Sequence, residues 1–198
     1  MLRRALLAVV LAAALVPAAA AATVHVRVEG KTQTLFGATE PRASGANALE
    51  ALESASLAGE LYYHVTQSSF GPYVDQVGRY GGSASSGWVF KVNGVSPPVG
   101  ADKVELKDGD RVLWYYADFG PSGGPPTLDL VRTRQGCYRV LQLDDNGKPS
   151  AAVGAVLRVD GRTVKTQGAG QAAVACPGPH KGLVRATLAG AVRSNAAP

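Results

Sequence analysis

The chain has 198 residues, of which 20 are basic and 15 are acidic, so its formal net charge is +5 at pH 7. A charge excess this small, without any cluster of Lys and Arg, does not indicate nucleic acid as a partner. The length allows one domain or two small ones.

The first 22 residues have the three regions of a secretory signal peptide. Arg3 and Arg4 form the charged region, residues 6–16 the apolar region, and Ala20-x-Ala22 the small-residue cleavage motif. The apolar run is too short and too rich in alanine for a membrane-spanning helix. We therefore expect residues 1–22 to be removed and the protein to be secreted, with no membrane span in the mature chain. Without Arg3 and Arg4, the mature chain has 18 basic and 15 acidic residues, so its net charge is +3.

The first mature segment predicts a β-hairpin followed by the one convincing helix of the chain. Residues 23–28, TVHVRV, alternate valine with polar residues, and the sequence returns as a second strand after a turn at residues 29–31. In the following ANALEALESA segment, Asn47 has the position of a helix cap and Glu50 completes the spacing of a capping box. Apolar residues recur on one face, and Gly59 is placed to end the helix in the left-handed conformation.

Residues 61–67 predict a third strand, and a long Gly-, Ser- and Tyr-rich segment follows at residues 68–86. We interpret this segment as a loop with a short strand at residues 73–77. Long ordered loops on small domains are often binding loops. Tyr73 and Tyr80 are therefore candidate ligand-binding residues.

Both tryptophans of the chain lie in residues 87–120. Trp88 and Phe90 alternate with Val89 and Lys91, and after a D-G-D turn Val112, Trp114 and Tyr116 alternate in the same way. An aromatic stripe at strand spacing, opposite an apolar helix, indicates a core more than a ligand site. The opposite face, with Lys91, Leu113 and Tyr115, is then expected to be exposed as a surface patch.

The motif GW-x-F-x-VNG, followed by L-x-DGD-x-V-x-W-x-Y, resembles the transcobalamin-like C-terminal (DUF4430-type) domain. The resemblance covers about residues 24–120 and implies a β-grasp-like domain, here residues 23–120, in which one helix crosses the sheet. In the vitamin B12 carriers of that family, a loop after the Trp strand lies against the corrin ring. Here that loop is residues 95–103, so Pro98, Val99 and Gly100 match by position and cobalamin is an alternative ligand. The carriers enclose the vitamin with a large helical barrel that this chain lacks, so capture would need a second, helical partner.

Residues 121–127 contain PSGGPP, a composition typical of a linker. Beyond it, six candidate strands between residues 128 and 188 are separated by turn signals, which predicts a small antiparallel β-sandwich over residues 128–198. The run from residue 146 to 177 resembles carboxypeptidase-regulatory-like and related immunoglobulin-like modules. In an exported chain the pair Cys137 and Cys176 favours a disulfide over a metal site, because His180 is the only other ligand nearby.

The sequence contains none of the motifs of the common hydrolases. It has no G-x-S-x-G and no H-E-x-x-H, and its three histidines lie in unrelated contexts. The DDNG sequence at residues 144–147 has the composition of a calcium loop but lacks the glutamate at loop position 12, which favours a simple turn. We therefore expect a mainly β protein with no catalytic residues, no metal site and no resident cofactor. The prediction is a secreted, non-catalytic binding protein for an unknown extracellular partner or small ligand, with cobalamin-type capture through residues 95–103 as the alternative.

Export predicts a defined amino terminus. Protein recovered from the culture medium should have an intact mass that corresponds to a chain beginning near Thr23, because signal peptidase cuts after an A-x-A motif. Recovery of the full-length chain from the membrane fraction would contradict this prediction.

Overall fold

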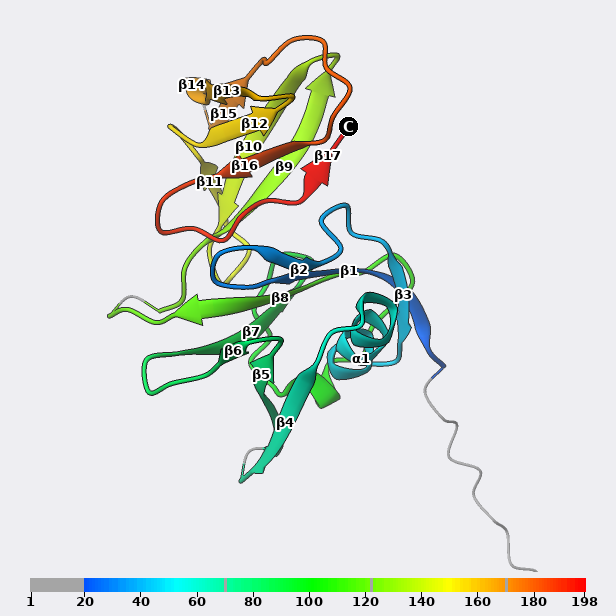
Figure 1. The fold of residues 1–198 in the computed structure, drawn as a ribbon. Helices are drawn as coiled ribbons and strands as arrows, with labels where there is room; N and C mark the ends of the chain where they lie inside the picture. Colours follow the sequence, from blue (N-terminus) through cyan, green and yellow to red (C-terminus); the bar gives the residue numbers. More distant parts are fainter. Residues whose placement is uncertain (1–19, 70, 122, 170) are drawn as a thin grey trace, which may run out of the picture.

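The computed structural model describes residues 20–198 apart from residues 70, 122 and 170. The predicted signal peptide lies outside the described residues except for its last three positions. The described chain is mainly β, with one α-helix, and forms two modules stacked on each other (Figure 1). Within the described residues, no helix has both the length and the apolar character needed to cross a membrane.

The first module is built on a mixed sheet that contains the predicted amino-terminal hairpin. Its strands are β1 (Ala22–Glu29), β2 (Thr34–Phe36), β3 (Arg42–Gly45), β7 (Ser86–Val92) and β8 (Arg111–Asp118). Their order is β2-β1-β8-β7, and β3 also pairs with β1; β1 and β8 are parallel, whereas the other pairs are antiparallel. A hairpin, a crossing helix and a parallel return beside the first strand make up the β-grasp arrangement expected from the resemblance.

The helix α1 (Ala48–Gly59) begins as the sequence predicts and ends one residue later than expected. The side chain of Asn47 accepts hydrogen bonds from the backbone N–H groups of Leu49 and Glu50, and Glu50 Oε2 accepts one from Ala46 N at 2.8 Å. The left-handed residue is Glu60, with φ of 50°, and not Gly59. Gly59 is needed for packing instead, since a Cβ atom there would lie 2.6 Å from the ring of Phe36.

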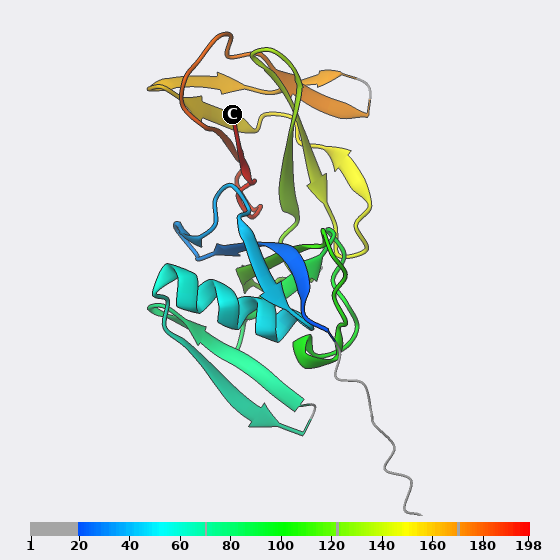
Figure 2. The same ribbon diagram turned by 90° about the vertical axis from the view of Figure 1, so that its right-hand side faces the viewer.

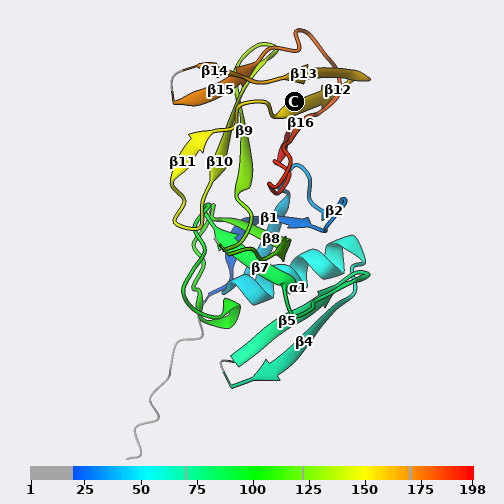
Figure 3. The ribbon, with the colours of Figure 1, turned by 90° about the vertical axis from the view of Figure 1, so that its left-hand side faces the viewer.

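The helix covers one face of the sheet, and the side chains between them form the first core. Val24, Val26 and Val28 of β1 are fully buried there, together with Trp88 and Trp114 from the predicted aromatic stripe. Figure 3 shows the sheet as a middle layer, with α1 on one side and the second module on the other. The prediction that the stripe faces the helix is therefore confirmed.

The third strand predicted at residues 61–67 and the short strand predicted at residues 73–77 are both present, and the rest of residues 68–86 is less of a loop than expected, because these strands belong to a small antiparallel sheet. Its strands are β4 (Tyr63–Ser68), β5 (Gly71–Val77) and β6 (Tyr80–Gly81). A β-bulge inserts Asp75 opposite the step from His64 to Val65, which brings Val74 and Val77 to the same buried side. The bulge breaks the two-residue period within the strand predicted at residues 73–77, and the strand itself begins two residues earlier, at Gly71. The β4–β5 hairpin extends beyond α1 (Figure 2).

The second module consists of two antiparallel sheets, as predicted. One contains β9 (Thr127–Arg134), β10 (Cys137–Leu143), β11 (Pro149–Ala151), β14 (Gln167–Ala169) and β15 (Ala172–Ala175). The other contains β12 (Val156–Val159), β13 (Arg162–Lys165), β16 (Val184–Thr187) and β17 (Ala196–Ala197). Six of these strands coincide with the predicted ones, and β11, β14 and β17 are too short to show alternation. Side chains from both sheets, including Leu130, Tyr138, Leu157 and Val184, form the second core.

The predicted disulfide between Cys137 and Cys176 is present, with a Cα–Cα distance of 4.0 Å. It joins β10 to the residue that follows β15, and these two strands are neighbours in one sheet, where Tyr138 is opposite Ala175. The bond therefore closes a loop within one sheet and does not connect the two sheets. On the chain-entropy model, closing a loop of this length stabilises the fold by about 4 kcal/mol.

The face of the first sheet predicted to be exposed is covered by the second module, so that prediction was wrong. Lys91 is 0 % exposed, Tyr115 1 % and Leu113 9 %. Leu113 and Tyr115 form a small interface core with Ala117 and Val192. The Lys91 ammonium donates to the backbone oxygens of Asp144 at 2.7 Å and Leu143 at 3.1 Å. Burial lowers the pKa of Lys91, and the nearby charges of Asp145 and Asp144 oppose that shift.

A buried ion cluster crosses the same interface. Glu29 is fully buried and accepts from Arg27 at 3.2 Å, from Arg193 Nε at 3.0 Å and from Arg185. Arg27 belongs to the first module, whereas Arg185 and Arg193 come from the second. A buried carboxylate is tolerated only when it is paired, so the cluster defines how the two modules fit together.

Neutralising Glu29 should therefore destabilise the whole chain. We expect Glu29→Gln to lower the free energy of unfolding by about 3 kcal/mol, because three guanidinium groups lose their shared counter-charge. Chemical denaturation followed by tryptophan fluorescence measures the difference, since both tryptophans lie in the first module. The control is Glu53→Gln on the exposed face of α1, which should change stability by less than about 0.5 kcal/mol. Equal stabilities for the two variants would show that the cluster contributes nothing.

Candidate functional site

The aromatic residues of β7 and β8 are locked by stacking and by hydrogen bonds from both indole groups. Phe90 stacks on Trp114 with 5.0 Å between ring centroids, and Trp88 meets Tyr116 edge-on at 5.8 Å. Trp88 Nε1 donates to the backbone oxygen of Tyr80 at 2.8 Å, and Trp114 Nε1 donates to that of Ala48 at 3.0 Å. Rings held in this way provide a rigid apolar surface at low entropic cost.

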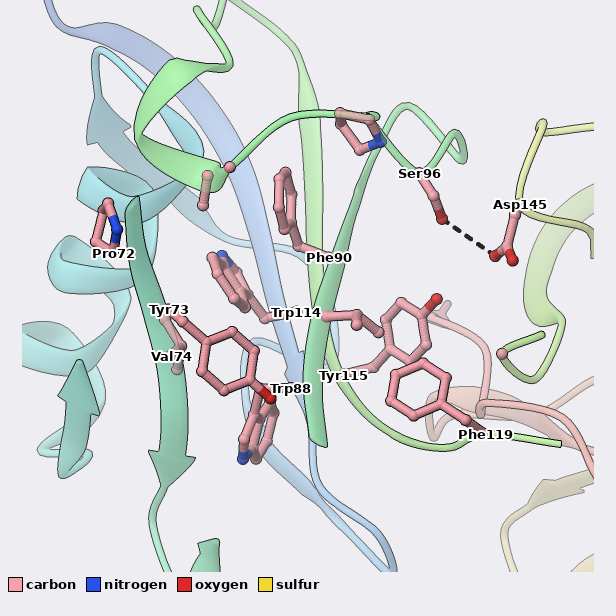
Figure 4. A pocket seen from close by; sticks show the side chains of 15 residues that line it. Pro72, Tyr73, Val74, Trp88, Phe90, Ser96, Trp114, Tyr115, Phe119 and Asp145 are labelled. Atoms are coloured by element: carbon pink, nitrogen blue, oxygen red, sulfur yellow. Dashed lines mark hydrogen bonds between the residues drawn. The ribbon is translucent and has the colours of Figure 1, made fainter. Parts of the chain in front are cut away.

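A cavity of about 300 Å³ lies against this surface, and we call it the β7 cavity (Figure 4). Residues on both sides of strand β7 line it. Those on the helix side are Pro72, Tyr73, Val74, Trp88, Phe90 and Trp114. Those on the side of the second module are Val89, Tyr115, Phe119, Gly124 and Asp145, and the loop residues Ser96, Pro97, Gly100 and Ala101 close one end.

The cavity lies along the edge of the sheet and not over one of its faces. Strand β7 is the last strand in the order β2-β1-β8-β7, so it pairs with a neighbour on one side only within the mixed sheet. Successive residues of a strand point to opposite faces, yet Trp88, Val89 and Phe90 all line the cavity. A single cavity can touch all three only where it borders the free edge of the strand.

The loop at the end of the cavity is held by the second module. Ser96 N donates to the backbone oxygen of Asp145 at 2.8 Å, and Ser96 Oγ donates to Asp145 Oδ1 at 3.1 Å. The loop then passes into the short 3₁₀ helix η1 (Ala101–Lys103), where Lys103 N donates to Gly100 O at 3.0 Å. The wall of the cavity is therefore shared by the two modules.

The ionisable groups of the cavity are concentrated at the Ser96 end. Asp145 Oδ1 lies 3.6 Å from the Lys91 ammonium, and the side chain of Asp145 keeps 48 % of its area exposed while that of Lys91 has none. Only the negative partner of this ion pair is accessible from the cavity. Burial raises the pKa of Tyr115 far above its ordinary value, and the charge of Asp145 adds to that shift, so the Tyr115 hydroxyl stays protonated.

The structure brings two of the five predicted ligand-binding residues together. Tyr73 and Gly100 both line the β7 cavity. Pro98 and Val99 are exposed on the outer side of the loop, and Val99 retains 49 % of its area. Tyr80 lies away from the cavity, where its ring packs against Tyr116 and its hydroxyl bonds Thr32 at 2.9 Å.

Several lining residues were missed because their placement depends on tertiary contacts. Ser96 and Asp145 are 49 positions apart and meet only through the docked modules. The signal for Phe119 was present in the sequence, since it is an aromatic residue just before the linker, and it keeps 45 % of its area exposed. Asp144, considered for a calcium loop, accepts from the N–H groups of Asn146 and Lys148, which makes the segment the predicted turn.

Together these features define a β-grasp-like module that carries an aromatic cavity at a sheet edge and has a β-sandwich docked on it. Residues 45–118 match the family model described as a domain of unknown function (DUF4430). The matched range contains α1 and the residues between Pro72 and Tyr115 that line the β7 cavity, and it includes the motifs that carry the transcobalamin-like resemblance. It stops before the second module, whose immunoglobulin-like resemblance stays a prediction. No curated protein matches the chain.

The free edge of β7 predicts an alternating pattern of amide exchange. Asn93 N donates to Arg111 O at 2.9 Å and Phe119 N donates to Ser85 O at 2.8 Å, so the odd-numbered residues of β7 exchange hydrogen bonds with β8. We expect the amides of Val89 and Lys91 to exchange slowly and those of Trp88 and Phe90 to exchange much faster. Hydrogen exchange followed by NMR resolves the four amides. Equal protection of neighbouring residues would contradict an open edge.

Proposed function

We propose that the protein is a secreted, non-catalytic binding protein that holds an apolar part of its partner in the β7 cavity. The observation that carries the proposal is the cavity itself, with about 300 Å³ bounded by Trp88, Phe90, Tyr115 and Phe119. Binding sites are typically concave, largely apolar and supplied with a few placed polar groups. Tyr73, Ser96 and Asp145 supply polar atoms of this kind.

The polar groups of the cavity favour recognition over catalysis. The Ser96 hydroxyl donates to Asp145, and Asp145 is also paired with Lys91. Serine nucleophiles of the common triads and dyads are bonded to a histidine or lysine base, whereas Ser96 is bonded to a carboxylate. These observations support a binding role for the same residues.

Cobalamin-type capture is the second candidate, and one observation favours it. Pro98 and Val99 are exposed, with Val99 half exposed, on the loop that closes one end of the cavity and matches the corrin-facing loop of the carriers. A cavity of about 300 Å³ is at the lower limit for a drug-sized ligand and is too small to enclose a corrin. Capture of cobalamin would therefore use residues 95–103 as one wall and a helical partner as the other.

An apolar fluorescent probe, 1-anilinonaphthalene-8-sulfonate, tests the first proposal. The mature protein should bind it with a saturable signal, and Phe119→Ser should weaken binding about tenfold, which corresponds to about 1.4 kcal/mol. The matched control is Leu57→Ser, which removes an apolar side chain that is 75 % exposed on α1, away from the cavity. Equal binding by the two variants would place the probe elsewhere and overturn the proposed site.

Titration with cobalamin separates the two candidates. Submicromolar binding that is lost in Gly100→Trp would make cobalamin capture the primary function of the chain. Weak or absent binding is expected, because one exposed loop provides few desolvated contacts and association costs at least about 4 kcal/mol.

A further inference from the structure

The edge of β7 is closed at both ends and open between them. At one end Ser83 N donates to Ser86 O at 2.7 Å, and at the other Val92 and Val95 exchange two hydrogen bonds at 2.9 and 3.0 Å. Between these bridges the backbone N–H and C=O groups of Trp88 and Phe90 point away from β8. No described residue is bonded to these four groups. They border the β7 cavity, because Trp88, Val89 and Phe90 all line it.

We propose that the β7 cavity binds an extended peptide segment, which adds to the mixed sheet as a further strand beside β7. This inference rests on the proposed function and specifies the chemical class of the partner. Two donors and two acceptors at the spacing of alternate residues match the backbone of one extended chain. Hydrogen bonds between the peptide backbone and β7 fix the register of the peptide, and the peptide side chains pack against the apolar walls of the cavity.

The walls indicate which side chains the peptide carries. Residues of an added strand point alternately toward Phe90 and Tyr73 on one side and toward Val89, Tyr115 and Phe119 on the other. Both walls are apolar, so the segment carries consecutive apolar residues. At the Ser96 end the accessible charge is the Asp145 carboxylate, since its partner Lys91 is buried. A basic side chain at that end of the peptide complements this charge.

A single strand fits this edge better than the edge of a second copy of the protein. The open stretch is flanked by the Ser83–Ser86 bridge, the Val92–Val95 bridge and the side chain of Tyr73, whose hydroxyl lies close to Gly87. If two copies of the protein approached edge to edge, these flanking groups would collide before the two β7 backbones came within hydrogen-bonding distance. An isolated peptide has no such flanks and reaches Trp88 and Phe90.

The experiment uses a display library of random linear peptides of about nine residues, long enough for one strand with its flanks. Peptides are enriched by binding to the mature protein with both of its modules. The enriched peptides are then synthesised with a methyl group on one backbone nitrogen at a time. Strand addition predicts that methylation of alternate residues weakens binding at least about tenfold, while methylation of the residues between them changes it little. In the complex, the amides of Trp88 and Phe90 should become protected from exchange.

The protein side of the test uses Phe90→Pro, with Phe90→Leu as the matched control. Both variants lose the aromatic ring, but only proline removes the N–H group that points into the cavity, and that group makes no bond to β8. We expect peptide affinity to fall at least about tenfold further in the proline variant. If Phe90→Pro does not fold, as judged by its thermal unfolding, the methylation pattern decides the question.

The outcomes separate this inference from the function on which it rests. Binding of the fluorescent probe with no peptide enriched, or peptide binding without an alternating pattern, would overturn strand addition and leave the apolar site in place. Failure of the probe and of the peptides together would overturn both.

Discussion

The burial of charge between the two modules is the constraint on which the rest of the structure depends. Glu29 and Lys91 lie on the first sheet and have no exposed area, so each must find its counter-charges or hydrogen-bond partners within the protein. Arg185 and Arg193 supply them for Glu29, and the backbone oxygens of Leu143 and Asp144 supply them for Lys91. If the two modules docked in any other relative position, these groups would be buried without partners, at a cost of several kcal/mol.

A second ion pair network extends the interface toward the solvent. Glu40 accepts from Arg27 at 3.2 Å and from Arg111 at 2.8 Å, and Arg111 also pairs with Asp129 of the second module at 2.9 Å. Burial raises the pKa of Glu40, but the hydrogen bond from Arg111 and the charge of Arg27 outweigh it and leave the pKa below the ordinary value. The stabilisation is therefore complete above the unfolded-state pKa of about 4.5 and is lost as the pH falls through the folded-state pKa.

The β7 cavity depends on this docking. Its aromatic wall belongs to the first module, but the loop at residues 95–103 is positioned by Asp145, which reaches across from the turn after β10. Buried aromatic rings usually lie inside a module, and here three of them also line an opening at a sheet edge. The second module thus acts as part of the site as well as a cover for the sheet.

The sequence alone was sufficient to predict the elements that depend on residues close together in the chain. The valine alternation of β1, the Asn47–Glu50 cap, the aromatic stripe of β7 and β8, and the Cys137–Cys176 pair were all predictable from spacing and residue type. Only the tertiary structure decided which face of the sheet is exposed, because the burial of Lys91 and Tyr115 depends on partners more than twenty residues away. The same reason applies to the site: Tyr73 and Gly100 line one cavity only because β5 packs against β7, and Asp145 joins them only after the modules dock. A pattern of alternation reports that a strand has two different faces, but what covers each face is determined by contacts between distant parts of the chain.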